Sequence, residues 1–248
     1  MRNLVNSLLS IFMASVCMIT LTRAEEPVLI IHAVDFPPYE IENPGVDSLL
    51  GFDVEVVVEA FDRVGLRARI DFRPWKRIVA MAHAGTTVAM LSCEKSPGRE
   101  DYINYSDPIS KATRTYVASI DFAGDVPNSM EEARGLKILV ISGYAAEKEL
   151  KNADINYEPV IHDASALRIL LNRDFDLFYS AREFVEYTAG GLGIADKVQY
   201  FDTGKQVFFH LCFSKKWPNS KIIRDKFNEG LTIIREDGTY DTIHEKYK

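Results

Sequence analysis

Aromatic, arginine and small polar side chains stand at the points where the predicted strands of this chain end. The first of them, Phe36 and Tyr39, lie in the rigid segment DFPPYE, after an apolar strand that starts at Val28. Flat aromatic faces at the carboxyl edge of a sheet are typical of small-molecule sites in open α/β folds. An arginine adds a planar fork that grips a carboxylate with two parallel hydrogen bonds and keeps its charge when desolvated. These residue types predict a site for a small anionic ligand, with the candidates Phe36, Tyr39, Trp75, Arg77, Ser92, Glu94, Ser96 and Arg99.

Each of these candidates also has an ordinary structural explanation. Arg99 precedes Glu100 and Asp101 and could be a solvated surface charge, while Trp75 could simply belong to the core. Their common position at one predicted sheet edge favours the binding site.

Other kinds of chemistry find little support in the sequence. The five histidines lie far apart and show no metal-ligand spacing. No serine lies in a nucleophile elbow, and the glycine-rich stretch 190–193 follows a predicted helix, whereas a phosphate-binding loop follows a strand. We therefore predict no metal, no cofactor and no catalytic residue.

Alternating strands and helices must position these residues. A first unit is predicted from the strands that start at Val28 and span 67–72 and 87–91, with helices over 51–65 and 75–84 that stop at Gly65 and Gly85. A second unit has strands over 136–141, 155–160 and 175–179, and helices over 145–150 and from Asp163. Helices over 221–235 and 240–247 close the chain. Such alternation favours mostly parallel sheets with helices on both faces, and the extended segments 112–119 and 205–213 predict two crossings that form a hinge.

The amino terminus has the pattern of an export signal. Arg2 precedes a 14-residue apolar run over 8–21, and small residues end at Ala24. The run is shorter than the roughly 20 residues that span a bilayer, so a membrane anchor is the weaker alternative, and lipidation of Cys17 is another. We predict a signal peptide over 1–24, cleaved after Ala24, and a periplasmic protein without membrane insertion.

The remaining chain is acidic. Removing residues 1–24 takes away two of the 29 basic residues and none of the 36 acidic ones, so the net charge changes from −7 to near −9. An acidic surface argues against nucleic acid and anionic membranes as partners. Two cysteines remain, Cys93 and Cys212, which could form a disulfide or be separate small buried hydrophobic residues.

Five segments together carry a resemblance to a known family. They are DFPPYE, GFDVEVVVEAF, SPGREDYINYSDPI, ILVISGY and LTIIREDGTYDTIHEKY, and their order and spacing cover the chain from Glu26 to Lys248. The chain resembles the family 3 bacterial extracellular solute-binding proteins, the receptors of polar amino-acid ABC transporters. The resemblance implies the two-lobed α/β periplasmic binding protein type II fold, with mixed sheets flanked by helices and two hinge crossings. It implies lobe 1 over 25–112 and 210–248, lobe 2 over 113–209, and a ligand trapped by closure.

The resemblance also implies roles for single residues. Phe36 and Tyr39 would pack on the ligand, Ser92 and Ser96 would offer polar contacts, and Arg99 would bind a carboxylate. In lobe 2, Ser142, Gly143 and Tyr144 would present backbone N–H groups at a helix start. Amino-acid binders of the family usually place an acid after the strand matched by 175–179; this chain has Ser180, Ala181 and Arg182 there, with Glu183 one step later. An Arg182 that faces the cleft would favour a second anionic group on the ligand.

The predicted function is that of a monomeric receptor. It would trap a small polar ligand that bears a carboxylate, an amino acid or a related compound, for import through an inner-membrane ABC permease. Two alternatives remain: a sensory protein that docks on a membrane kinase, and a dehydratase-like enzyme on the same fold with Glu94 or Glu183 as general acid.

Overall fold

A computed structural model describes residues 28–125, 127 and 129–247 of the chain. The predicted signal peptide lies outside these described residues. Within them, the strands are β1 Leu29–Ala33, β2 Ala68–Phe72, β3 Ala89–Glu94, β4 Ile103–Ser119, β5 Ile138–Ile141, β6 Tyr157–Val160, β7 Leu177–Ala181 and β8 Val198–Ser214. The helices are α1 Phe52–Arg63, α2 Trp75–Ala84, α3 Ala145–Asn152, α4 Asp163–Asn172, α5 Arg182–Gly191, the short 3₁₀ helix Ala195–Lys197, α6 Ser220–Glu236 and α7 Thr239–Glu245.

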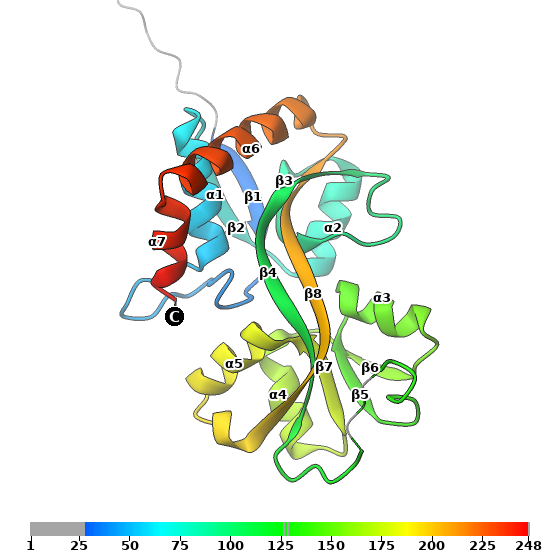
Figure 1. Cartoon of the computed structure of the whole chain (residues 1–248). Coiled ribbons are helices and arrows are strands. Elements are labelled where there is room, and N and C mark those ends of the chain that lie inside the picture. The colour runs from blue at the N-terminus through cyan, green and yellow to red at the C-terminus, as the bar shows by residue number, and fades with distance from the viewer. Residues whose placement is uncertain (1–27, 126, 128, 248) are drawn as a thin grey trace, which may run out of the picture.

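The strands pair in the order β2-β1-β3-β8-β4-β7-β5-β6. The two central strands, β4 and β8, are antiparallel and 17 residues long, and they run through both halves of the molecule (Figure 1). Parallel pairs lie on both sides of them: β1 with β2 and β3, and β5 with β6 and β7. The mixed α/β architecture expected from the sequence is confirmed.

The other elements divide into two lobes (Figure 1). Lobe 1 consists of β1, β2 and β3 with helices α1, α2, α6 and α7, and lobe 2 consists of β5, β6 and β7 with α3, α4 and α5. The predicted boundaries at residues 112 and 210 fall inside β4 and β8, which continue through them without a break. The exact division of the chain therefore remains a prediction.

Most predicted elements are found near their expected positions because their apolar periodicity is strong. Val57 and Phe61 on α1 are fully buried, and the chain leaves the helix through Gly65 at φ 72°. Helix α2 ends at Gly85, whose φ of 83° favours glycine. The two crossings are longer than predicted: β4 begins at Ile103, ahead of the predicted start at 112, because register shifts around Pro108 allow the ladder to continue.

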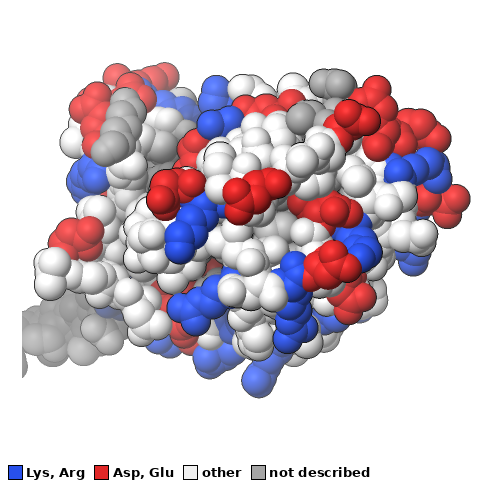
Figure 2. All heavy atoms as spheres, turned by 90° about the horizontal axis from the view of Figure 1, so that it is seen from below, with Lys and Arg blue, Asp and Glu red and all other residues white. Residues whose placement is uncertain are grey.

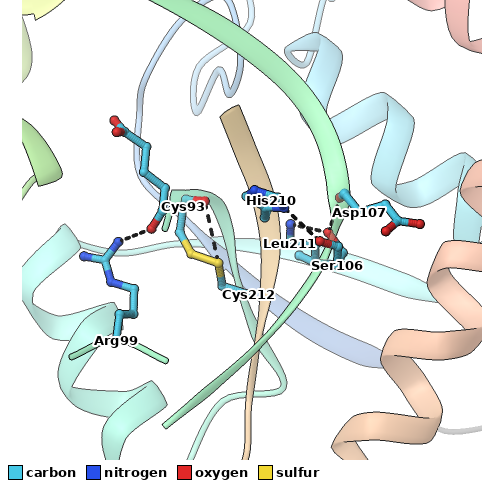
Figure 3. The surroundings of a disulfide bond; sticks show 8 residues. Cys93, Arg99, Ser106, Asp107, His210, Leu211 and Cys212 are labelled. Atoms are coloured by element: carbon cyan, nitrogen blue, oxygen red, sulfur yellow. Dashed lines mark hydrogen bonds between the residues drawn. A yellow bond between two sulfur atoms is a disulfide. The ribbon is translucent and has the colours of Figure 1, made fainter. Parts of the chain in front are cut away.

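A disulfide joins Cys93 on β3 to Cys212 on β8 (Figure 3). The two Cα atoms are 6.2 Å apart, and both side chains are fully buried. Beside them the His210 ring is hydrogen-bonded through Nδ1 to the carbonyl oxygen of Ser106 at 2.8 Å. Of the two possibilities left open by the sequence, the structure has the disulfide, which fastens a neighbouring pair of strands in lobe 1.

Helices α1 and α6 touch at Gly230. A Cβ atom at this position would lie 1.9 Å from the carbonyl oxygen of Ala60, so only glycine allows this approach.

None of the helices that the structure describes is long and apolar enough to cross a bilayer. Acidic and basic side chains are interspersed on the face of the molecule shown in Figure 2.

Candidate functional site

A cleft lies between the two lobes, in front of the crossing strands. The space between its walls, including the open solvent at its mouth, is about 550 Å³. Its lining comes from lobe 1, lobe 2 and both crossing strands: Val34, Phe36, Trp75, Ser92, Glu94, Arg99, Arg114, Ile141, Tyr144, Ala145, Ala146, Tyr179, Ser180, Ala181 and Phe209.

Aromatic side chains bring the two lobes into contact around this cleft. The ring of Phe36 in lobe 1 stacks on Phe184 of lobe 2 at 4.8 Å between centroids and meets Tyr144 edge-on at 6.0 Å. The indole N–H of Trp75 in lobe 1 donates to the carbonyl oxygen of Gly143 in lobe 2 at 3.0 Å. The structure is therefore a closed form, in which contacts between ring faces and hydrogen bonds such as this one hold the lobes together.

Arg99 follows β3 and lies against the cleft. Its side chain is 2% exposed, its guanidinium lies over the Trp75 ring at 5.5 Å, and Nη1 donates to the carbonyl oxygen of Glu94 at 2.8 Å. Its buried Nε has no hydrogen-bond partner among the described residues. A buried guanidinium held by a neutral carbonyl and a ring face retains both a full charge and a free donor, which suits a carboxylate.

Lys148 of α3 reaches across the lobes to the segment that carries Arg99. Its Nζ donates to Ser96 Oγ at 3.0 Å and to the carbonyl oxygen of Pro97 at 3.3 Å. Burial and the nearby positive charge of Arg99 lower the pKa of Lys148. The rim of the cleft beside Arg99 is therefore positively charged, with the exposed Glu100 nearby.

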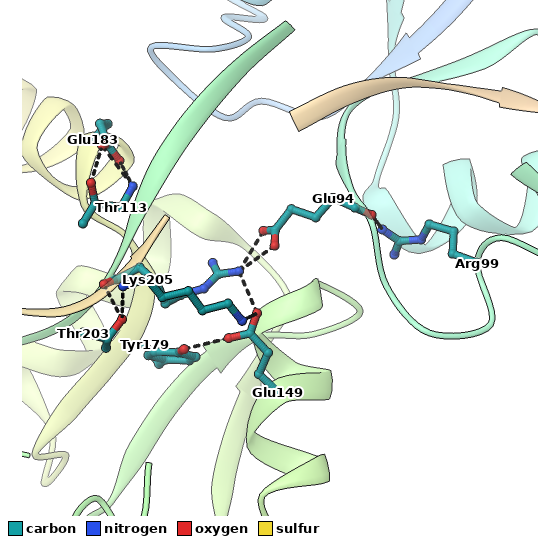
Figure 4. A network of polar contacts seen from close by, with 9 residues as sticks. Glu94, Arg99, Thr113, Glu149, Tyr179, Glu183, Thr203 and Lys205 are labelled. Atoms are coloured by element: carbon teal, nitrogen blue, oxygen red, sulfur yellow. Dashed lines mark hydrogen bonds and ion pairs between the residues drawn. The ribbon is translucent and has the colours of Figure 1, made fainter. Parts of the chain in front are cut away.

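An ion-pair cluster closes the opposite end of the cleft, toward the crossing strands (Figure 4). Nη2 of Arg114 on β4 donates to both carboxylate oxygens of Glu94, at 2.9 and 2.7 Å, and to Glu149 of α3 at 3.2 Å. Glu149 also pairs with Lys205 of β8 at 2.8 Å and accepts the hydroxyl hydrogen of Tyr179 at 2.7 Å. These four charged groups from lobe 1, lobe 2 and both crossing strands sum to zero.

The pKa values in this cluster follow the pairing. Burial alone would lower the pKa of Arg114, but Glu94 and Glu149 outweigh it and the pKa is raised. Burial alone would raise the pKa of Glu149, but Arg114 and Lys205 outweigh it and the pKa is lowered. Arg114 and Glu149 therefore both remain charged at neutral pH. Nε of Arg114, like that of Arg99, is buried and has no partner among the described residues.

Two buried carboxyl groups stand behind the cleft wall at Ser92. The Ser92 hydroxyl donates to Oδ2 of Asp53 at 2.6 Å, and Ser110 donates to the same oxygen at 2.9 Å. Both Asp53 and Glu40 are fully buried, and each has one oxygen without a partner in the described structure. Burial raises the pKa of Asp53 to about 7 and that of Glu40 well above its usual value.

The cleft brings together seven of the residues predicted from the sequence, namely Phe36, Trp75, Ser92, Glu94, Arg99, Tyr144 and Ser180. Tyr39 is fully buried behind the wall, stacked on Phe36 at 5.2 Å, and its hydroxyl donates to the carbonyl oxygen of Lys111. Ser96 lies under Lys148 and outside the lining, and Arg77 is exposed on α2.

The expected anion site at the start of α3 is already filled by the chain itself. Glu147 accepts the N–H of Gly143 at 2.6 Å through its carboxylate, and the N–H of Ser142 donates to the carbonyl oxygen of Val160. The first two residues of the helix, Ala145 and Ala146, line the cleft instead.

Arg182 and Glu183 also lie outside the cleft lining. Arg182 pairs with Glu186 and Asp202, each at 2.7 Å, because both carboxylates are within reach of its position at the start of α5. Both oxygens of Glu183 accept the N–H of Thr113, each at 3.0 Å, so this carboxylate supports a crossing strand (Figure 4). Arg182 supplies no second anion site in this structure.

Sequence reasoning missed Arg114, Tyr179 and Phe209, all of which line the cleft. Arg114 had a usable signal: it is a single charge inside an extended, otherwise uncharged stretch predicted to cross between the lobes. A charge in such a position needs partners, and the structure supplies them in Glu94 and Glu149.

Comparisons with known proteins agree with this geometry. A family model described as bacterial extracellular solute-binding proteins, family 3, matches residues 28–248. The L-cystine-binding protein TcyA of Bacillus subtilis is 24% identical over 213 residues, which cover 86% of this chain and 77% of that protein. A histidine kinase sensor domain with similarity to periplasmic binding proteins has a TM-score of 0.79 at 17% identity, covering 89% of this chain and 95% of its own. The ancestral amino-acid-binding protein AncCDT-1, a precursor of cyclohexadienyl dehydratase, has a TM-score of 0.74 at 20% identity, over 89% and 95% of the two chains.

Proposed function

Since the chain belongs to family 3 of the bacterial extracellular solute-binding proteins, we propose that its cleft captures a small solute through a carboxylate bound by Arg99. The observation that carries this proposal is the buried guanidinium of Arg99, which lines the cleft; among the described residues its Nε has no partner and no carboxylate is bonded to it. The aromatic rings of Phe36, Trp75 and Phe209 supply the apolar walls. Closure of the two lobes around the crossing strands then removes the solute from water.

Delivery to an inner-membrane ABC permease completes the proposed role. TcyA is by name an L-cystine-binding protein, and a putative ABC transporter arginine-binding protein of Escherichia coli is 22% identical over 236 residues, which supports a transport role by similarity. The family is described as extracellular. We infer a periplasmic, monomeric protein whose signal peptide is cleaved after Ala24. N-terminal sequencing of the exported protein tests the cleavage, because an intact Met1 or a lipid on Cys17 would contradict it.

The two acids that a dehydratase mechanism would use are both held by other groups of the chain, which favours binding without turnover. Glu94 is bonded to Arg114, and Glu183 is bonded to the backbone of Thr113. A carboxylate whose oxygens already accept hydrogen bonds from the chain is not free to act on a bound solute. Product analysis after incubation with any bound solute tests this inference, and accumulation of product would contradict it.

A thermal-shift screen of small carboxylates tests the carboxylate site. A ligand at 100 times its dissociation constant stabilises the folded chain by about 2.7 kcal/mol, which is a shift of a few degrees for a chain of this size. Arg99→Ala should remove most of that shift because the loss of a charge-assisted pair costs on the order of 2 to 4 kcal/mol of binding free energy.

The matched control is Arg182→Ala, because Arg182 is also an arginine in two ion pairs but lies outside the cleft lining. This variant should keep the full shift. An equal loss in both variants, or an undiminished shift in Arg99→Ala, would contradict carboxylate binding at Arg99.

A further inference from the structure

We propose that the cleft selects small carboxylates that lack an ammonium group, with 2-oxo acids as the best-fitting class, over the corresponding α-amino acids. This inference rests on the proposed carboxylate binding at Arg99 and concerns the rest of the same ligand. It follows from three features of the cleft: its acids, its net charge and its free hydrogen-bonding atoms.

Among the described residues that line the cleft, Glu94 is the only acid. An α-ammonium needs a carboxylate or its equivalent to leave water, since a buried charge without a partner is costly. Both oxygens of Glu94 are already bonded to Nη2 of Arg114. The other carboxylate of the cluster, Glu149, is shared among Arg114, Lys205 and Tyr179.

The net charge of the cleft favours an anion over a zwitterion. The positive charges of Arg114 and Lys205 balance the negative charges of Glu94 and Glu149. The charge of Arg99 is left without a counterpart in this cluster. A ligand of charge −1 balances Arg99, and the positive charge of Lys148 at the rim also favours an anion. A zwitterionic amino acid would leave the excess positive charge in place and add a cation to a cleft that already holds two buried guanidinium groups.

The free polar atoms of the cleft are donors. Nε of Arg99 and Nε of Arg114 are both buried, both belong to residues that line the cleft, and both lack a partner among the described residues. An ammonium group can only donate, so it satisfies neither of them. A ligand carboxylate at one guanidinium and a keto oxygen directed toward the other would satisfy both. The other polar side chains of the lining are the hydroxyls and the indole N–H of Ser92, Ser180, Tyr144, Tyr179 and Trp75, and none of them can neutralise a cation.

Isothermal titration with matched pairs tests this selectivity on the unmodified protein. The pairs are pyruvate with alanine, phenylpyruvate with phenylalanine, and 2-oxoglutarate with glutamate, and each pair differs only in the keto or ammonium group. We expect at least one 2-oxo acid to bind, and each that binds to do so at least 10-fold more tightly than its amino acid. An amino acid that binds more tightly than its 2-oxo partner would overturn the proposal.

Failure of all three 2-oxo acids to bind would also overturn it. The proposed function would then still be judged separately, by whether any carboxylate in the broader screen gives a shift that Arg99→Ala largely removes.

Arg114→Met provides a second test because it removes the cation that occupies Glu94. The vacated carboxylate should then accept an ammonium, and the ratio of 2-oxo acid to amino acid affinity should fall at least 10-fold. Arg182→Met is the matched control and should leave that ratio unchanged, since Arg182 lies outside the cleft lining. An unchanged ratio in a folded Arg114→Met variant would overturn the role of the ion pair, and the wild-type ratio decides the selectivity if that variant does not fold.

Discussion

Breaking the disulfide between Cys93 and Cys212 should destabilise the chain by about 5 kcal/mol. The two cysteines are 119 residues apart, so the bond closes a loop that contains all of lobe 2. The loop-closure model gives an entropy of about 16 cal/mol/K for a loop of this length, or about 5 kcal/mol at 25 °C, acting on the unfolded chain. Both sulfur atoms belong to fully buried residues, which makes this bond inaccessible to reductant while the chain is folded.

Urea denaturation curves of the oxidised and reduced protein measure this effect. The reduced sample is unfolded and refolded in reductant so that the buried bond is opened. With a slope of about 2 to 3 kcal/mol/M, the midpoint should fall by roughly 2 M. A thiol titration in denaturant is the control, and reduction should add two thiols.

Coincident midpoints together with two added thiols would refute the loop-closure reasoning. No added thiols would refute the disulfide itself. The same samples should bind a solute with similar affinity, because the bond fastens β3 to β8 within lobe 1 and does not join the two lobes.

Three further perturbations test other parts of the structure. Gly230→Ala should lower the free energy of unfolding by about 1 to 3 kcal/mol in denaturant titrations, because its Cβ would lie 1.9 Å from the carbonyl oxygen of Ala60. Asp53→Asn should flatten the dependence of stability on pH. The pKa of Asp53 in the folded chain is raised to about 7, whereas the unfolded chain releases this proton near pH 4. The wild type therefore loses stability as the pH rises from about 4 to 7. Glu183→Gln should lower the melting temperature, because one of the two oxygens that accept the N–H of Thr113 becomes a donor, while the ranking of solutes should stay the same.

Each of these predictions has its own check. Gly190→Ala is the control for Gly230, because its Cβ would meet nothing within 4 Å and a helical alanine should add up to about 1 kcal/mol. Equal slopes of stability against pH for wild type and Asp53→Asn would show that Asp53 does not carry the raised pKa. A changed ranking of solutes in Glu183→Gln would return this residue to the ligand site.

The sequence was most informative where one local pattern determines a structure. The apolar stripes that place Val57 and Phe61 in the core, and the glycine that ends α2, are local features, and the elements they predict are present. Phe36 and Arg99 could likewise be placed at the cleft, because the ends of neighbouring strands meet at one edge of a sheet.

The sequence was least informative where the partner of a charge decides its role. Arg182 and Arg114 are both arginines near predicted strand ends, but the first meets Glu186 and Asp202 at the surface and the second is enclosed in the cleft. The ion-pair partners of Arg114 are Glu94 on β3 and Glu149 on α3, which are 55 residues apart in the chain. Local periodicity carries no information about contacts between segments that are distant in the sequence, so the ion-pair cluster could not be predicted.

The position of β8 between β3 and β4 has a consequence for the order in which the molecule can be assembled. Lobe 1 needs β8 to join its sheet and α6 to cover α1, and both come from the last fifty-one residues of the chain. Strands β5 to β7 and their helices come from one continuous stretch that precedes those residues in the chain, and β7 pairs with β4. A chain that emerges from its amino end, in synthesis or in export, can therefore form most of its second lobe first, and it has neither a closed first lobe nor a cleft until β8 and α6 follow.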